Sequence, residues 1–151
     1  MKSEEGEYSI HDLHRDRKAP WFGVRNYQAR NYMRDEMHVG DLVIFYHSNG
    51  NPSASVGIAK VASTPYPDET QFDTSSHYYY PKATQESPVW MLVDVSFVEI
   101  FSTPVSIDEM RKTKTLKDMI MLKKGSRLSV TPLTKKEFNC LERLGSRDQK
   151  K

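Results

Sequence analysis

A run of alternating side chains in residues 89–101 limits the folds open to this chain more than any other feature. Val89, Met91, Val93, Val95 and Phe97 alternate with Trp90, Leu92, Asp94 and Ser96. Because successive side chains of a strand point to opposite faces, this period predicts one long strand. The β-rich run 42–46 and residues 56–61, joined by the turn sequence Asn-Gly-Asn-Pro, predict a hairpin that belongs to the same sheet.

Short helices are expected around this sheet, and three of the four open with a polar residue that can cap the first turn. They cover residues 10–16 after Ser9, residues 26–37, a segment after Ser106, and the residues from Thr134 to a stop at Gly145. Asp or Glu three positions after Ser9, Ser106 and Thr134 predicts a capping box. Residues 128–130 are typical of a last short strand. The sum is an α+β fold: a mixed, mostly antiparallel β pseudo-barrel with short peripheral helices.

The length of 151 residues fits a single domain, which we place at residues 1–145, with a polar tail at 146–151. Residues 64–87 form a long predicted loop rich in Pro, Ser, Thr and Tyr, and loops of this length are usually functional or disordered. No apolar run approaches the roughly 20 residues that cross a bilayer. The only cysteine, Cys140, excludes an intramolecular disulfide and a cysteine-based zinc site.

Catalytic patterns are missing from the sequence. There is no phosphate loop, no dinucleotide-binding glycine pattern and no nucleophile elbow. The five histidines have no metal-ligand spacing. We therefore expect a binding protein without a cofactor or metal, and not an enzyme.

Charge is distributed unevenly along the chain, although the net charge is only +2. One acid, Asp118, lies within a basic run that comprises Arg111, Lys112, Lys114, Lys117, Lys123, Lys124 and Arg127. Such a run can contact nucleic-acid phosphates, but it also occurs on ordinary solvated faces.

Aromatic and polar side chains gather in three segments that could form a ligand pocket. Residues 20–31 place Trp21 before a helix start, where free backbone N–H groups can bind an acceptor. Residues 45–48 end a strand with polar groups, and residues 78–82 carry three tyrosines and a lysine. Together these groups could hold a planar heterocycle.

The order of these segments resembles the EVE domain family over nearly the whole chain. The segments that carry the resemblance are 1–4, 8–10, 21–31, 39–41, 45–48, 56–59, 65–68, 79–82, Trp90 with 93–95, and 127–130. The resemblance implies a PUA-like β-barrel related to the YTH readers of methylated adenine in RNA. It also implies recognition of modified bases, often in DNA, without catalysis.

The resemblance also suggests site residues. Trp21 matches an aromatic-cage position of the YTH relatives and should supply a stacking face, while residues 2–3 and 25–26 should read the edge of the base. Tyr27 and Arg30 could instead be supporting residues, residues 78–82 a lid, and Arg127 a structural ion pair. The candidate ligand-binding residues are Lys2, Ser3, Trp21, Val24, Arg25, Asn26, Tyr27, Arg30, Tyr46, His47, Ser48, Tyr79, Tyr80, Lys82, Arg127 and Ser129.

The hypothesis is a monomeric module that binds DNA or RNA carrying a modified, flipped-out cytosine or adenine. It would work in the cytoplasm, or in the nucleus of a eukaryote, without a membrane partner. The alternative is a sensor of, or an enzyme acting on, a nucleoside-like small molecule, which the nearly neutral charge favours.

Overall fold

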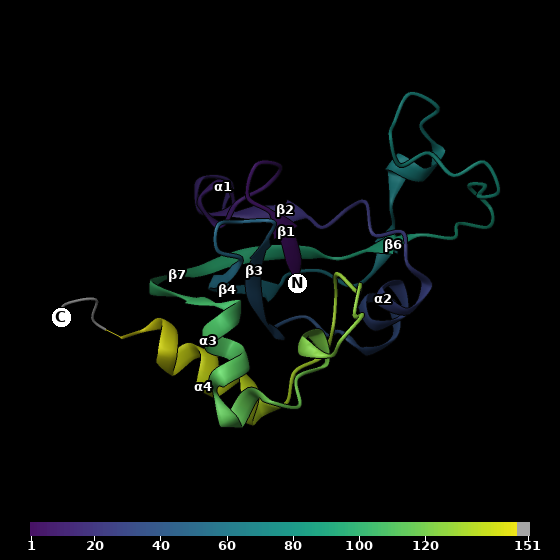
Figure 1. Ribbon diagram of the computed structural model, residues 1–151. Coiled ribbons are helices and arrows are strands. Elements are labelled where there is room, and N and C mark those ends of the chain that lie inside the picture. The colour runs from purple at the N-terminus through teal and green to yellow at the C-terminus, as the bar shows by residue number, and fades with distance from the viewer. Residues whose placement is uncertain (148–151) are drawn as a thin grey trace.

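The computed structural model describes residues 1–147, and the end of the predicted polar tail, residues 148–151, lies outside the described residues. Five strands form the main sheet in the order β1-β3-β4-β7-β2 (Figure 1). Their bounds are β1 Lys2–Glu4, β2 Lys18–Pro20, β3 Leu42–Ser48, β4 Ala54–Val61 and β7 Asp94–Ser106. β1 is parallel to β3, and the other neighbours are antiparallel, including the predicted β3–β4 hairpin.

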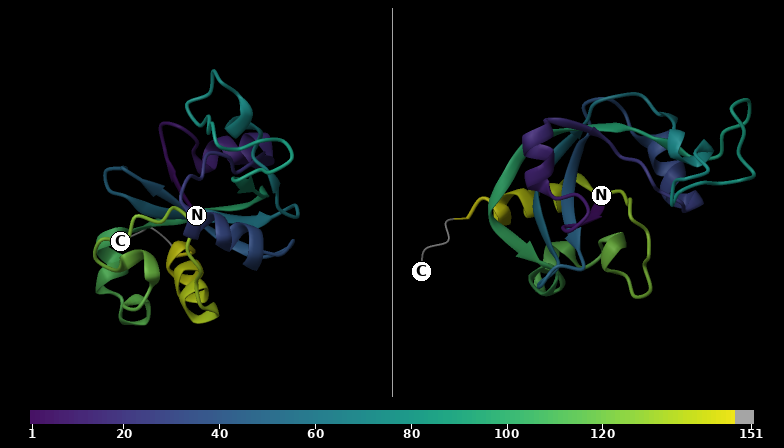
Figure 2. Two further views of the ribbon diagram at one scale, coloured as in Figure 1. Left: turned by 90° about the vertical axis from the view of Figure 1, so that its right-hand side faces the viewer. Right: turned by 90° about the horizontal axis from the view of Figure 1, so that it is seen from above.

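The sheet curls strongly, as the two views in Figure 2 show. Its hydrogen-bonded order nevertheless ends at β1 on one edge and at β2 on the other. The predicted α+β class with a mostly antiparallel sheet is therefore confirmed, and closure into a pseudo-barrel stays a prediction.

Residues 89–101 do not form the single strand that their alternation predicts. β6 Met91–Leu92 pairs with β5 Tyr66–Pro67 in a separate two-stranded sheet, and β7 begins only at Asp94. Between them, the carbonyl of Val93 accepts a hydrogen bond from the Trp21 amide at 2.9 Å. Alternating hydrophobic and polar residues indicate which side chains are buried. They do not indicate that the chain changes from one pairing strand to another.

The strand predicted at residues 128–130 is also wrong. One backbone hydrogen bond, from Lys2 N–H to the Ser129 carbonyl at 2.8 Å, joins this segment to β1. A single bond of this kind does not make a ladder, so the segment follows the edge of β1 without being a strand.

The helices begin near the predicted caps. α1 Ile10–Asp16 and α4 Lys135–Gly145 have complete capping boxes, as expected. α3 Ile107–Lys112 has half of one, because the Glu109 carboxylate pairs with Arg147, which lies in the predicted tail. The helix predicted at 26–37 consists of α2 Tyr27–Asn31 and a π-helix Tyr32–Glu36. Three 3-10 turns complete the set: Glu69–Phe72, Lys114–Leu116 and Ile120–Leu122.

Both faces of the sheet are buried, which explains the uninterrupted apolar run of β3. Val43 and Phe45 pack in a core cluster with α1 and α2, whereas Ile44 and Tyr46 pack in a second cluster with α3 and α4. Tyr27 of α2 is 53% exposed and lies outside both clusters. The helices therefore cover the sheet on both sides, and a hollow lies between its two edge strands, β1 and β2.

Candidate nucleic-acid interface

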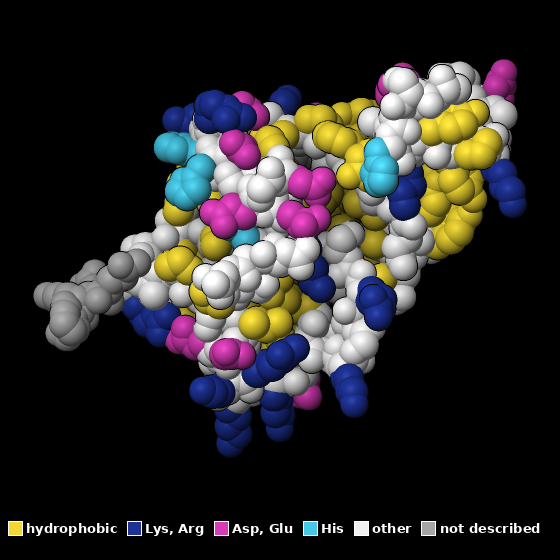
Figure 3. Space-filling model, turned by 45° about the horizontal axis from the view of Figure 1, so that its top comes forward, with side chains coloured by type: hydrophobic (Ala, Val, Ile, Leu, Met, Phe, Trp, Pro, Cys, Tyr) yellow, Lys and Arg dark blue, Asp and Glu magenta, His cyan; other side chains and the backbone are white. Residues whose placement is uncertain are grey.

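A pocket of about 820 Å³ lies between β1, the segment after α1 and the loop that contains Tyr78. Figure 3 shows a hollow on this side of the molecule, with hydrophobic side chains inside it and acidic side chains beside it. The lining residues are Lys2, Ser3, Glu4, Glu7, Tyr8, Asp16, Lys18, Ala19, Pro20, Trp21, Phe22, Gly23, Val24, Arg25, Ser48, Tyr78, Arg127 and Ser129. The volume is within the range of ordinary small-ligand sites.

Three aromatic rings form one wall of this pocket. Trp21 is 9% exposed and packs edge-on against Phe45, with 5.3 Å between ring centroids. Phe22 is 52% exposed and meets Tyr78 edge-to-face at 5.8 Å. A wall of this kind presents the π-faces and edges on which a planar base can stack.

Gly23 lets Tyr78 approach the chain at this wall. Its φ of +88° lies in the left-handed region, and a Cβ built there would be 2.8 Å from the Tyr78 ring. Its amide donates a 2.7 Å hydrogen bond to the Asp68 carboxylate. Glycine is thus required here both by backbone conformation and by the close contact.

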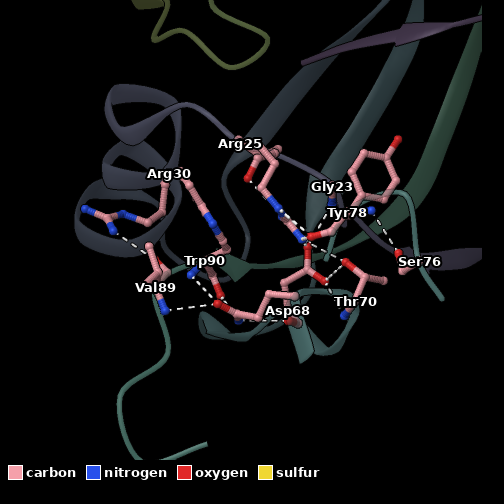
Figure 4. Close-up of polar contacts among 11 residues, drawn as sticks. Gly23, Arg25, Arg30, Asp68, Thr70, Ser76, Tyr78, Val89 and Trp90 are labelled. Carbon is pink, nitrogen blue, oxygen red and sulfur yellow. Dashed lines mark hydrogen bonds and ion pairs between the residues drawn. The ribbon is translucent and has the colours of Figure 1, made fainter. Parts of the chain in front are cut away.

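Arg25 ties the loop that contains Tyr78 to the rest of the site (Figure 4). Its guanidinium donates five hydrogen bonds, which matches its five N–H groups. The acceptors are the carboxylate of Asp68, the hydroxyl of Thr70 and the carbonyl oxygens of Val24 and Tyr78. Arg25 therefore borders the pocket while its donors are used inside the protein.

Asp68 is the buried centre of this network. Burial raises the pKa of its carboxyl, but hydrogen bonds from Gly23, Thr70 and Arg25 lower it more, so that its pKa is below the ordinary value. The carboxylate accepts from Gly23 N–H, from Thr70 and from Arg25, and it is nearly inaccessible to solvent. A buried charge of this kind is stable only when such partners surround it.

We expect Gly23→Ala to weaken ligand binding by moving Tyr78. Gly40→Ala is the matched control, because Gly40 has a φ of +97° and nothing within 4 Å of a built Cβ. Each variant should lose roughly 1–2 kcal/mol of unfolding free energy from the left-handed backbone. Only Gly23→Ala should weaken binding of the ligand, measured by fluorescence anisotropy. Equal binding by the two variants would show that Tyr78 does not contribute to the binding site.

Cations and carboxylates line the rim of the pocket. Within residues 1–147, Lys2, Lys18 and Arg127 form no ion pair. Burial lowers the pKa of the half-buried Lys2. On the acidic side, Asp16 accepts a 2.8 Å hydrogen bond from the Tyr8 hydroxyl, and burial and this carboxylate raise the Tyr8 pKa. The rim thus offers unpaired donors for an anion and carboxylate acceptors for an amino group.

The pocket brings together half of the residues proposed from the sequence. These are Lys2, Ser3, Trp21, Val24, Arg25, Ser48, Arg127 and Ser129. Of the long basic run, only Arg127 is among the residues that line it. The second half of the proposed residues lies elsewhere in the described chain.

Asn26, Tyr27, Arg30 and Tyr80 lie around α2. The Asn26 side chain caps the helix by accepting from the Ala29 amide at 3.0 Å. Tyr27 and Tyr80 pack against the buried Trp90, at centroid distances of 4.8 and 5.5 Å. Arg30 donates to the Val89 carbonyl and also lies over Trp90. These contacts hold α2 to the loop; Tyr79 and Lys82 are exposed nearby and do not line the pocket.

Tyr46 and His47 do not line this pocket. Tyr46 is 4% exposed and borders a second pocket of about 660 Å³ on the α4 side of the sheet. His47 is buried, and its Nε2 accepts a 3.1 Å hydrogen bond from the Ile10 amide at the start of α1. An imidazole that accepts a hydrogen bond at Nε2 is neutral.

The protonation of His47 should make stability depend on pH. Burial lowers its pKa below the ordinary value of 6.5, so the unfolded chain binds the proton more readily than the folded protein. Stability should therefore be lost as pH falls below about 6.5 and on toward the folded pKa. Denaturant titrations of wild type and His47→Gln, which retains an acceptor, should diverge over this window. Parallel pH curves for the two would contradict this assignment.

The sequence interpretation missed several residues of the pocket and of the network behind it. Phe22 and Gly23 lie inside the quoted segment 21–31, and Asp68 is the last residue of the segment 65–68, but their roles depend on contacts with residues about 45–55 positions away. Gly23 itself was the available signal, since glycine often marks a left-handed turn. Tyr8 lies in the quoted segment 8–10 without having been proposed as a site residue, and Lys18 and the acidic rim had no sequence signal.

Neither a metal cluster nor a membrane-spanning helix is found in the part of the chain that the structure describes. No group of three His, Cys, Asp or Glu side chains there could hold a metal ion. No helix among residues 1–147 is long and apolar enough to cross a membrane.

Comparison with known proteins identifies the class that this fold and pocket represent. The family model of the EVE domain matches residues 1–144, and the chain belongs to the EVE domain family. Mouse thymocyte nuclear protein 1 is 39% identical over 143 residues, which cover 88% of this chain and 62% of that protein. The human protein is 36% identical over 148 residues, covering 91% of this chain and 65% of its own length. The chain thus spans less than two thirds of these relatives.

Solved structures resemble the chain over almost its full length. A crystal structure of a Pseudomonas syringae protein has a TM-score of 0.92 and 43% identity, covering 96% of this chain and 97% of that one. Human THYN1, crystallised in complex with DNA containing 5-methylcytosine, has a TM-score of 0.88 and 35% identity. That likeness covers 98% of this chain and 96% of the human chain.

Proposed function

We propose that this chain is a non-catalytic reader of a modified base in a nucleic acid, with 5-methylcytosine in DNA as the first candidate. The observation that carries the proposal is the pocket with an aromatic wall of Trp21, Phe22 and Tyr78 and a rim of unpaired cations. The likeness to human THYN1, a protein crystallised with DNA containing 5-methylcytosine, supports it. We also propose that the curled sheet is a PUA-like pseudo-barrel, whose open end forms this pocket.

The shape and chemistry of the pocket suit an extruded base. A base that leaves the duplex loses stacking and pairing worth a few kcal/mol. Stacking on an aromatic side chain returns roughly 1–3 kcal/mol per base. Trp21 and Tyr78 offer such surfaces, and a volume of about 820 Å³ leaves room for the sugar at the mouth.

The rim can read the polar edge of a cytosine. Its exocyclic amino group is a donor, and Asp or Glu side chains accept from it in nucleic-acid complexes. Glu7 lines the pocket, and its carboxylate has no hydrogen-bond partner within residues 1–147. Lys2, Lys18 and Arg127 are free to meet phosphates around the extruded nucleotide.

We also propose that the chain does not catalyse a reaction on the base that it binds. The nucleophile candidates at the pocket, Ser3, Ser48 and Ser129, have no histidine beside them in the lining, and the Ser3 hydroxyl donates to the Tyr8 carbonyl. A hydroxyl without a base is a weak nucleophile. The name of the thymocyte nuclear proteins indicates a nuclear location for these relatives. For this chain, we propose a nuclear or cytoplasmic location.

A binding panel tests the proposed function. The protein would be titrated with oligonucleotides containing 5-methylcytosine or cytosine, N6-methyladenine or adenine, in DNA and RNA, and with the free nucleosides. We expect about tenfold or greater preference for one modified polymer, since one lost pocket contact of 1–3 kcal/mol corresponds to this ratio. Equal affinity for modified and unmodified polymers would reject the reader.

The same panel separates the reader from the small-molecule alternative. Binding to a polymer should weaken with salt, with a log–log slope of about −0.7 to −0.9 for each phosphate contact. A nucleoside sensor would show almost no salt dependence and equal affinity for the nucleoside and the oligonucleotide. Mass spectrometry of the recovered ligands would reveal any turnover, which the reader excludes.

A further inference from the structure

Phe22 is an apolar side chain at the mouth of a pocket whose rim is otherwise charged. Its ring is 52% exposed, whereas the preceding Trp21 is 9% exposed and packs in the core. Exposed rings of this size are costly to leave in water, because burying a phenylalanine side chain is worth about 1.5–3 kcal/mol. Phe22 belongs to the aromatic wall of the pocket, and the exposed half of its ring is available to whatever approaches the mouth.

The backbone holds this ring in a fixed, projecting position. On one side the Trp21 amide donates to the Val93 carbonyl at 2.9 Å. On the other side the Gly23 amide donates to the buried Asp68 carboxylate at 2.7 Å. The Tyr78 ring supports Phe22 edge-to-face at 5.8 Å. A ring that is already ordered loses little conformational entropy when it makes a contact.

A duplex from which one base is extruded into the pocket is stabilised when an apolar ring takes the place of that base in the stack. Extrusion leaves a gap in the stack, and apolar side chains inserted between base steps fill gaps of this kind. Resting on the proposed function, we propose that Phe22 is a wedge that enters the duplex at the position vacated by the extruded base. The target of this site is then a modified base in double-stranded DNA, and the wedge offsets the cost of opening the duplex.

Three probes carrying one 5-methylcytosine test the wedge. They are a fully paired duplex, the same duplex with a mismatch opposite the modified base, and the single strand. Phe22→Ala should bind the paired duplex about tenfold or more weakly than wild type, since unstacking one step costs a few kcal/mol. It should bind the single strand within about twofold of wild type, because no stack has to be opened. The mismatched duplex should recover much of the lost affinity.

Two further variants separate the wedge from loss of folding. Phe22→Leu keeps an apolar wedge and should retain most duplex binding. Val98→Ala removes another exposed apolar side chain, on β7, that does not line the pocket, and should bind as wild type. Melting temperatures of all variants should agree within a few degrees, because Phe22 is exposed.

The outcomes distinguish the wedge from the reader. If wild type prefers the methylated duplex and Phe22→Ala loses equal affinity for duplex and single strand, Phe22 acts only as a wall of the pocket and the wedge is overturned. If wild type itself does not distinguish methylated from unmethylated DNA, the proposed function fails and the wedge fails with it. An increase in fluorescence of a 2-aminopurine next to the modified base, seen with wild type and lost with Phe22→Ala, would support the wedge.

Discussion

Asp68→Asn should lower the free energy of unfolding by about 3–5 kcal/mol, the cost of breaking a buried ion pair by removing one partner. The substitution keeps the size of the side chain but removes the charge that receives hydrogen bonds from Gly23 and Arg25. The new amide group would also place a donor where only donors surround it. For a domain of this length, the melting temperature should fall by about 10 °C.

Asp35→Asn is the control for this experiment. Asp35 also pairs with an arginine, Arg34, at 2.7 Å, but both side chains are exposed to solvent, at 51% and 42%. Surface pairs contribute little, so the melting temperature should hardly change. A comparable loss in the two variants would show that the Asp68 network does not stabilise the loop. Because this network positions Gly23 and Tyr78, Asp68→Asn should also lose ligand affinity, whereas Asp35→Asn should keep it.

Neutralising two cations at the pocket rim should have the largest effect on nucleic-acid affinity. We expect the double variant Lys18→Gln/Arg127→Gln to bind DNA about 10- to 30-fold more weakly at 0.15 M salt, with a salt slope shallower by about 1.5. Both residues line the pocket and form no ion pair among the described residues, so their charge is available to phosphates. The loss should be the same for methylated and unmethylated DNA, because phosphates carry no base identity.

Lys112→Gln/Lys114→Gln is the matched control, since it removes the same charge from the end of α3 and the turn after it. In Figure 1 this region lies on the opposite side of the sheet from β2. Its salt slope should remain that of wild type. A loss confined to this control variant would place the DNA on the α3 side and would contradict the interface at the pocket.

The sequence predicts elements whose signals are local. The caps at Ser9, Ser106 and Thr134 mark three helix starts correctly, because a cap depends on its own first turn. The β3–β4 hairpin is likewise specified by its turn. The break between β6 and β7 escapes prediction, because it depends on Val93 pairing with Trp21 and on β5, which are distant in sequence.

The candidate site shows the same division. Trp21 and Arg127 reach the pocket as proposed, but nothing in the sequence tells which polar neighbour is already engaged within the protein. Arg25 is the clearest case, since four of its five hydrogen bonds go to a loop more than 40 residues away. His47 is another, because its role as acceptor depends on how α1 packs on β3. The residue types in the sequence indicate which side chains could bind a ligand. Their tertiary contacts decide which of them are free to bind it and which support the fold.

The structure of a complex with a short duplex containing one 5-methylcytosine would show directly whether this pocket holds the modified base. We predict that the modified base lies outside the stack, in contact with Trp21 and Tyr78, with Lys18 and Arg127 at the flanking phosphates. A complex in which the modified base stays stacked in the duplex, with no nucleotide in this pocket, would contradict it.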